Sequence, residues 1–185
     1  MDNLNFILNK DNYLEGNINQ IKNYKRVFEM VMPEEDDESI SILNTLFENK
    51  IYQVAIQISD NLFMETVEED LKKYKIEYTA FDPNKGKNNR YFIIKPSSSN
   101  QVSYIIDLIY KVSVVNEICI VCLGNPTSIT FQKLPSNKLE KLLKKEYWIP
   151  CCELVQNSCC AFISLDGALV TLAENEYELF EDFIS

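Results

Sequence analysis

The sequence predicts an α+β fold: a mainly antiparallel sheet with a ferredoxin-like βαββαβ centre, N-terminal helices and a C-terminal β-hairpin plus helix. Three observations support this class. Helical apolar spacing and short strand-like apolar runs follow one another along the chain. In the central part their order is strand, helix, strand, strand, helix, strand, which is typical of ferredoxin-like folds. The chain has 185 residues and is 46% hydrophobic, so it can bury a core without disulfides or a metal.

Residues 1–50 predict an N-terminal helical segment packed on the core. Apolar side chains recur there at three- and four-residue spacing before Pro33, which is typical of an amphipathic helix that a proline ends. They are Ile18, Ile21, Tyr24, Phe28 and Val31. A second helix is expected next, because Ile40, Leu43 and Phe47 repeat the helical spacing.

Residues 51–125 predict the βαββαβ core. A strand over 51–59 precedes a helix that Asp60 can cap. The apolar stripe of that helix is expected at Phe63, Val67, Leu71 and Tyr74. The next two strands should be joined as a hairpin by the turn-rich loop 82–89.

The second half of this core predicts a helix and a buried strand. Ser98 and Gln101 have the spacing of a capping box at the start of the helix. The buried face of the helix is expected at Val102, Ile105, Ile106 and Ile109. The apolar run 117–123 follows as a strand.

Residues 126–185 predict a C-terminal α/β extension, and the whole chain is interpreted as one compact domain. The expected elements are a strand at 128–134, a helix capped by Ser136, three strands ending in a hairpin at Asp166 and Gly167, and a helix over 174–184. If the six residues between the two cysteine pairs connect two strands as a hairpin, Cys152 would lie opposite Cys159 and Cys151 opposite Cys160.

The net charge limits the possible partners. The formal charge is −10, and the acidic excess lies at the two ends of the chain. A negative surface repels phosphate backbones, so direct binding to nucleic acid is not expected. The chain contains no histidine, which removes the commonest proton carrier near neutral pH and the commonest metal ligand. An enzyme is therefore less favoured, although Cys, Lys, Asp and Glu can also perform catalysis.

The first residues and the apolar segments predict the compartment. Residues 1–10 lack the basic start and apolar run of a secretory signal. No segment approaches the roughly 20 apolar residues that span a bilayer. We expect a soluble cytoplasmic protein with no membrane partner, whose six cysteines stay reduced. The oligomeric state is left open.

The cysteines have three possible roles. Neighbouring residues of a strand point to opposite faces, so Cys151 and Cys152, like Cys159 and Cys160, are poorly placed to hold one ion together. Cys119 and Cys122 have CxxC spacing, but they lie in an apolar strand. We interpret all six as core residues, with a redox role and a metal site as alternatives. No metal and no cofactor are expected.

Two acidic runs are the candidate partner-binding residues. The first starts the second helix, where carboxylates interact favourably with the helix dipole, and it lacks the ligand spacing of a calcium loop. It comprises Glu34, Glu35, Asp36, Asp37 and Glu38. The second lies in the expected last helix and comprises Glu174, Glu176, Glu178, Glu181 and Asp182. A face of one charge sign can steer a basic partner, although it is also compatible with an ordinary acidic surface.

One basic loop is the candidate ligand-binding site. Lys85, Lys87 and Arg90 lie among asparagines in the 82–90 segment and could hold an anion, or they could form a solvated hairpin tip. The strand after this loop bears aromatic residues, as in RNA-recognition modules, but it lacks the glycines of that motif.

These observations predict an acidic cytoplasmic module that binds a basic protein partner. An inhibitor or immunity protein that neutralises a toxin, particularly a nuclease, fits the size, the charge and the absence of an evident catalytic group. The alternative is a small enzyme or ligand-binding regulatory domain on a ferredoxin-like sheet. Its site would be the 82–90 loop or a cysteine.

Overall fold

The computed structural model describes residues 6–9, 20–48, 50–83, 90–115, 118–133, 148–164 and 166–177. The strands are β1 (Ile7–Leu8), β2 (Gln20–Lys22), β3 (Arg26–Val31), β4 (Ile51–Ile58), β5 (Glu77–Phe81), β6 (Arg90–Lys95), β7 (Cys119–Gly124), β8 (Ser128–Lys133), β9 (Trp148–Glu153), β10 (Ser158–Ser164) and β11 (Leu169–Asn175). The helices are α1 (Asp36–Phe47), α2 (Asn61–Lys73) and α3 (Ser99–Val114). The predicted α+β class is confirmed.

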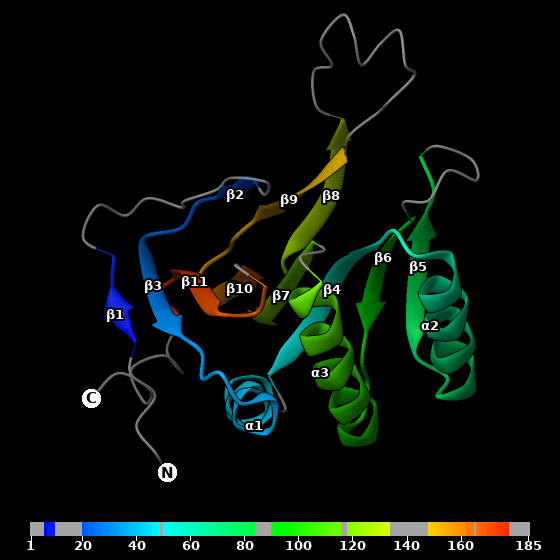
Figure 1. The fold of residues 1–185 in the computed structure, drawn as a ribbon. Coiled ribbons are helices and arrows are strands. Elements are labelled where there is room, and N and C mark those ends of the chain that lie inside the picture. Colours follow the sequence, from blue (N-terminus) through cyan, green and yellow to red (C-terminus); the bar gives the residue numbers. More distant parts are fainter. Residues whose placement is uncertain are drawn as a thin grey trace, which may run out of the picture.

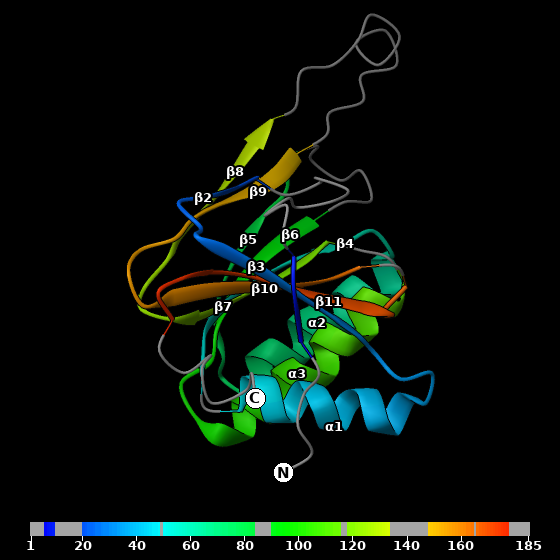
Figure 2. The same cartoon turned by 90° about the vertical axis from the view of Figure 1, so that its left-hand side faces the viewer.

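The elements form three layers (Figures 1 and 2). The middle layer is an antiparallel sheet of eight strands in the order β1-β3-β11-β10-β7-β4-β6-β5. Helices α1, α2 and α3 cover one face of this sheet, as Figure 2 shows. A second sheet of three strands, in the order β2-β9-β8, lies on the other face.

Burial on both faces explains the continuous apolar runs of the central strands. In β10, Cys159, Ala161 and Ile163 belong to the helix-side core, whereas Cys160 and Phe162 belong to the core under the small sheet. Side chains alternate between faces along a strand, so both sets need cover. A strand covered on both sides becomes apolar throughout, without a polar face.

The N-terminal helix predicted before Pro33 is wrong. Of its apolar residues, Ile21 lies in β2 and Phe28 and Val31 lie in β3, while Ile18 lies outside the described residues. Between the two strands, Asn23 has a positive φ of 63°, which suits a turn. Val27 and Phe28 are both buried, but Val27 faces the small sheet and Phe28 faces the helices. Two-sided burial therefore produced an apolar spacing that resembled a helical stripe.

The three described helices start where the sequence predicts. Acidic residues occupy the first turn of α1, and the Asp60 carboxylate accepts a hydrogen bond from the backbone N–H of Phe63 at 2.7 Å. Ser98 lies at the N-cap of α3, but its side chain makes no capping hydrogen bond. Gln101 instead accepts a bond from the Ser97 backbone N–H at 2.7 Å and donates one to the Tyr74 carbonyl at 3.1 Å. The predicted start is confirmed, and the predicted capping bond is wrong.

The C-terminal part differs from the prediction in two places. β9 and β10 do not pair as a hairpin, because β9 belongs to the small sheet and β10 to the large one. Glu174 and Asn175 end strand β11, so the last helix does not begin at Glu174. The helix expected after Ser136 and the remainder of the last helix lie outside the described residues. Among the described helices, none is long and apolar enough to cross a membrane.

Candidate functional site

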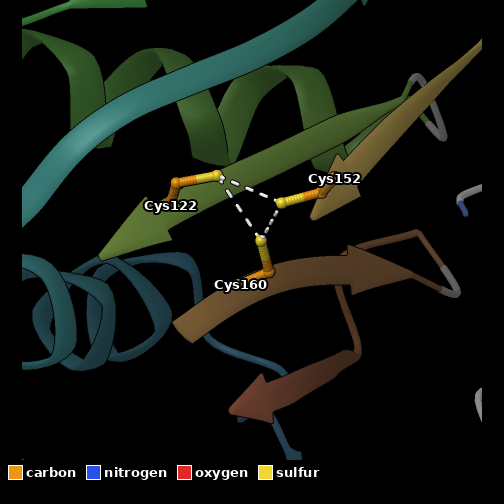
Figure 3. Close-up of side chains that lie close together, drawn as sticks. All are labelled: Cys122, Cys152 and Cys160. Atoms are coloured by element: carbon orange, nitrogen blue, oxygen red, sulfur yellow. Dashed lines mark hydrogen bonds between the residues drawn. The ribbon is translucent and has the colours of Figure 1, made fainter. Parts of the chain in front are cut away.

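Three cysteine sulfurs meet between the two sheets (Figure 3). The Sγ atoms of Cys152 and Cys160 are 2.8 Å apart, those of Cys122 and Cys160 are 3.4 Å apart, and those of Cys122 and Cys152 are 3.8 Å apart. All three side chains are buried, with exposed fractions of 0 to 1%. We call these three residues the thiol cluster.

Strand register brings the thiol cluster together. Cys160 of β10 lies directly opposite Cys122 of β7 in the large sheet. Both side chains point toward the small sheet, where Cys152 of β9 points back at them (Figure 3). Each cysteine therefore comes from a different strand, and one of the three comes from a different sheet.

The surroundings of the thiol cluster are mainly apolar. The other buried apolar side chains of this core are Ile21, Val27, Ala55, Ile120, Leu154, Phe162 and Ala173. One buried polar residue, Gln53 of β4, lies opposite Cys122 in the sheet register. Within such a core a sulfur finds polar partners mainly in the other two sulfurs. Hydrogen bonds from Cys122 and Cys160 lower the pKa of Cys152 despite its burial. The bond to Cys152 raises the pKa of Cys122, and burial raises that of Cys160.

This arrangement is suited to chemistry of sulfur alone. Three thiols that share protons can present thiolates to a soft metal ion, and two of them can be oxidised to a disulfide. In the described part of the chain, this is the one group of three or more cysteine and acidic side chains with ligand atoms close enough for a metal.

The remaining cysteines lie apart from the thiol cluster. Cys119 and Cys159 face the helices, where burial raises the pKa of each thiol. Cys151 is buried beside the thiol cluster but is not part of it. The thiol cluster takes one cysteine from each adjacent pair and one from the CxxC segment. Sequence reasoning kept the members of each pair apart but missed their meeting across the sheets.

All five residues of the first acidic run are exposed. Glu34, Glu35, Asp36, Asp37 and Glu38 all lie on the surface at the start of α1. Among the described residues, none of the five forms an ion pair. Asp36 accepts a hydrogen bond of 2.5 Å from the Tyr110 hydroxyl, and this bond raises the pKa of Tyr110 to about 12.

Two large apolar side chains are exposed on the strands β1 and β3. Val31, at the end of β3, is 76% exposed, and Ile7, on the edge strand β1, is 68% exposed. Ile7 lies opposite Glu29 of β3, so it is close to Val31 on the sheet. We call the surface formed by Ile7, Val31 and 34–38 the α1 edge.

The second acidic run is not a free surface where the structure describes it. Glu174 is fully buried; it forms an ion pair with Arg26 and accepts a 2.8 Å hydrogen bond from the Tyr177 backbone N–H. The prediction that Glu174 lies on an outer helical face is therefore wrong. Glu176 forms an ion pair with Lys25, whose hydrogen bond lowers the pKa of the carboxyl. Glu178, Glu181 and Asp182 lie outside the described residues.

The basic loop is described only at its end. Arg90 donates a hydrogen bond of 2.6 Å to the Glu68 carboxylate, which joins β6 to α2. Lys85 and Lys87 lie outside the described residues. Anion binding at this loop stays a prediction, and part of the Arg90 guanidinium is already used within the fold.

Known proteins give no further guidance on the site. Comparison of the chain with protein-family models, with curated proteins and with solved structures found no match in any of the three.

Proposed function

We propose that this protein binds a basic protein partner through the α1 edge. The observation that carries this proposal is the exposure of five consecutive carboxylates, 34–38, with no ion pair among the described residues. The net charge of the whole chain, −10, has the same negative sign as these carboxylates. Fields of one sign accelerate the encounter with an oppositely charged protein.

The apolar side chains of the α1 edge support a specific complex. Charges at the rim mainly affect the rate of association, while buried apolar contacts contribute more to its lifetime. Val31, three residues before Glu34 in the chain, and its sheet neighbour Ile7 are both large and exposed. A partner with a basic patch around an apolar centre would complement this surface.

An inhibitor or immunity protein that neutralises a basic toxin or nuclease is the class we propose. Such a protein acts by covering a basic surface and needs no catalytic group of its own. A ferredoxin-like centre is proposed for the scaffold, on the strand order β7-β4-β6-β5 and the two helices α2 and α3. The α1 edge lies outside this centre, on elements that precede it in the chain.

Charge neutralisation tests the proposal. A variant with Glu34, Glu35 and Glu38 changed to Gln and Asp36 and Asp37 changed to Asn should no longer retain the partner from extracts of the natural host. The wild-type protein should retain it at a ratio of one to one. Crosslinks between the wild-type protein and its partner should map to α1. Raising the salt from 50 to 300 mM should slow their association about tenfold or more, because salt screens exposed charges.

A matched variant separates a local effect from one of net charge. Glu48, Glu65, Glu69, Glu77 and Asp166 are exposed acids elsewhere on the surface, and changing them to amides alters the charge by the same amount. This variant should keep the partner. Equal loss of binding in both variants, or association independent of salt, would contradict the proposal.

A further inference from the structure

The thiol cluster has the composition of a metal site that coordinates through sulfur alone. Its three ligand atoms come from β7, β9 and β10 and all lie within 4.8 Å of one another. Cysteines that serve only as small apolar core residues do not need to contact one another, because each sulfur can pack against hydrocarbon side chains. Cys119 and Cys159 on the opposite side of the same sheet are separated in this way.

The size of the sulfur triangle is close to that of a trigonal site. From the three Sγ distances, the point equidistant from the sulfurs is about 2.0 Å from each, and a metal–sulfur bond is about 2.3 Å long. A regular trigonal site with this bond length separates its sulfurs by about 4.0 Å. The Cys152–Cys160 pair, at 2.8 Å, would therefore open by about 1.2 Å, and the other two distances would change less.

The number of ligand atoms selects the kind of ion. Zinc in protein sites is nearly always four-coordinate, with its ligands in a tetrahedron. Among the described residues, no fourth cysteine or acidic side chain joins the three sulfurs, and the chain contains no histidine. Soft thiolates prefer soft ions, of which copper(I) is the common biological case. Three sulfurs in an apolar core therefore suit a soft ion of low coordination number better than zinc.

We infer that Cys122, Cys152 and Cys160 form a three-sulfur site for one copper(I) ion between the two sheets. This site differs from the α1 edge in place and in chemistry, so either proposal can fail without the other. The bound ion would link β9 of the small sheet to β7 and β10 of the large sheet.

Anaerobic titration with Cu(I), supplied as its acetonitrile complex in competition with bathocuproine disulfonate, tests this inference. One ion per chain should leave the chelator. Changing Cys122, Cys152 or Cys160 to Ala should weaken binding by at least about a hundredfold, because each change removes a direct ligand. Cys119→Ala and Cys159→Ala remove equally buried sulfurs on the other face and should change the affinity by less than about threefold.

X-ray absorption of the copper-loaded wild-type protein is independent of the variants. It should find three sulfurs at about 2.3 Å and no nitrogen or oxygen ligand. Failure to withdraw copper, fewer than three sulfurs, or equal losses from the Cys119 and Cys159 variants would overturn the inference. A Cys152–Cys160 disulfide in protein alkylated at cell lysis would also overturn it, since these sulfurs could not then bind as thiolates.

Discussion

Cys159 and Cys160 are neighbours in β10, yet their surroundings differ completely. Cys159 points to the helix side of the large sheet, where burial and the Glu174 carboxylate raise the pKa of its thiol. Cys160 points to the small-sheet side, where its sulfur contacts those of Cys122 and Cys152. Residues of the same type on the same strand thus become an inert core thiol and a member of a potential ligand set. The layer that covers each face of the sheet decides the environment of each cysteine.

The two sides also differ in size and in their polar residues. The helix side holds the larger apolar core and one buried carboxylate, Glu174, which Arg26 partners. The small-sheet side holds a smaller core with three sulfurs at its centre. Glu174 and the three sulfurs are thus paired locally, whereas the buried Tyr177 hydroxyl has no hydrogen-bond partner among the described residues.

The largest expected effect comes from core truncation on both sides. Phe92→Ala, on the helix side, should lower the free energy of unfolding by about 4 kcal/mol, because Phe92 is fully buried. Phe162→Ala, on the small-sheet side, should cost about 3 kcal/mol, since its side chain is 8% exposed. Urea denaturation measures both. A cost near zero for Phe162→Ala would mean that the small sheet does not close a real core.

A smaller effect is expected at the polar pair of the helix side. Arg26→Leu should lower the free energy of unfolding by about 2 kcal/mol, because it leaves the buried Glu174 carboxylate without its cation. The cost stays below that of a fully buried pair, since the Arg26 side chain is 44% exposed. Combining Arg26→Leu with Glu174→Gln in a double-mutant cycle should recover part of the lost free energy of unfolding. Additive losses would show that the two charges do not interact.

The smallest effect is expected at the exposed pair beside this core. The Lys25 ammonium lowers the pKa of the Glu176 carboxyl, so the pair adds stability above the unfolded pKa and loses it as the pH falls through the folded value. Lys25→Met should move the carboxyl pKa, followed by NMR, up toward 4.5. An unchanged titration would show that solvent screens the pair completely. Lys111→Met, which breaks another exposed pair, is the control.

Local patterns were sufficient for the elements that depend on local interactions. The starts of α1 and α2 follow from the acidic first turn and from Asp60, because these side chains lie within a few residues of the helix. Helix α3 also starts after Ser98 as predicted, although the Ser98 side chain makes no capping bond. Strands β4 to β8 were likewise visible as apolar runs. The segment before Pro33 failed because burial on two faces gave an apolar spacing that also fits a helix.

The candidate sites divide in the same way. Exposure of 34–38 was predictable, since a run of five acids cannot be buried without partners. Burial of Glu174 was not, because Arg26, which pairs with it, is far away in the sequence. The contact among the three sulfurs was also not predictable from the sequence. The hairpin considered there would place β9 and β10 in one sheet, whereas they belong to different sheets.

By itself, the sequence determined the acidic charge and the helix starts. It also determined that the two sulfurs of each adjacent cysteine pair point to opposite faces of a sheet. These properties depend on composition, on capping over a few residues and on the two-residue period of a strand. Only the tertiary structure decided which sulfurs meet and which carboxylate is buried. Both outcomes depend on pairing between strands distant in the chain and on which layer covers each face. No local period of the sequence encodes either choice.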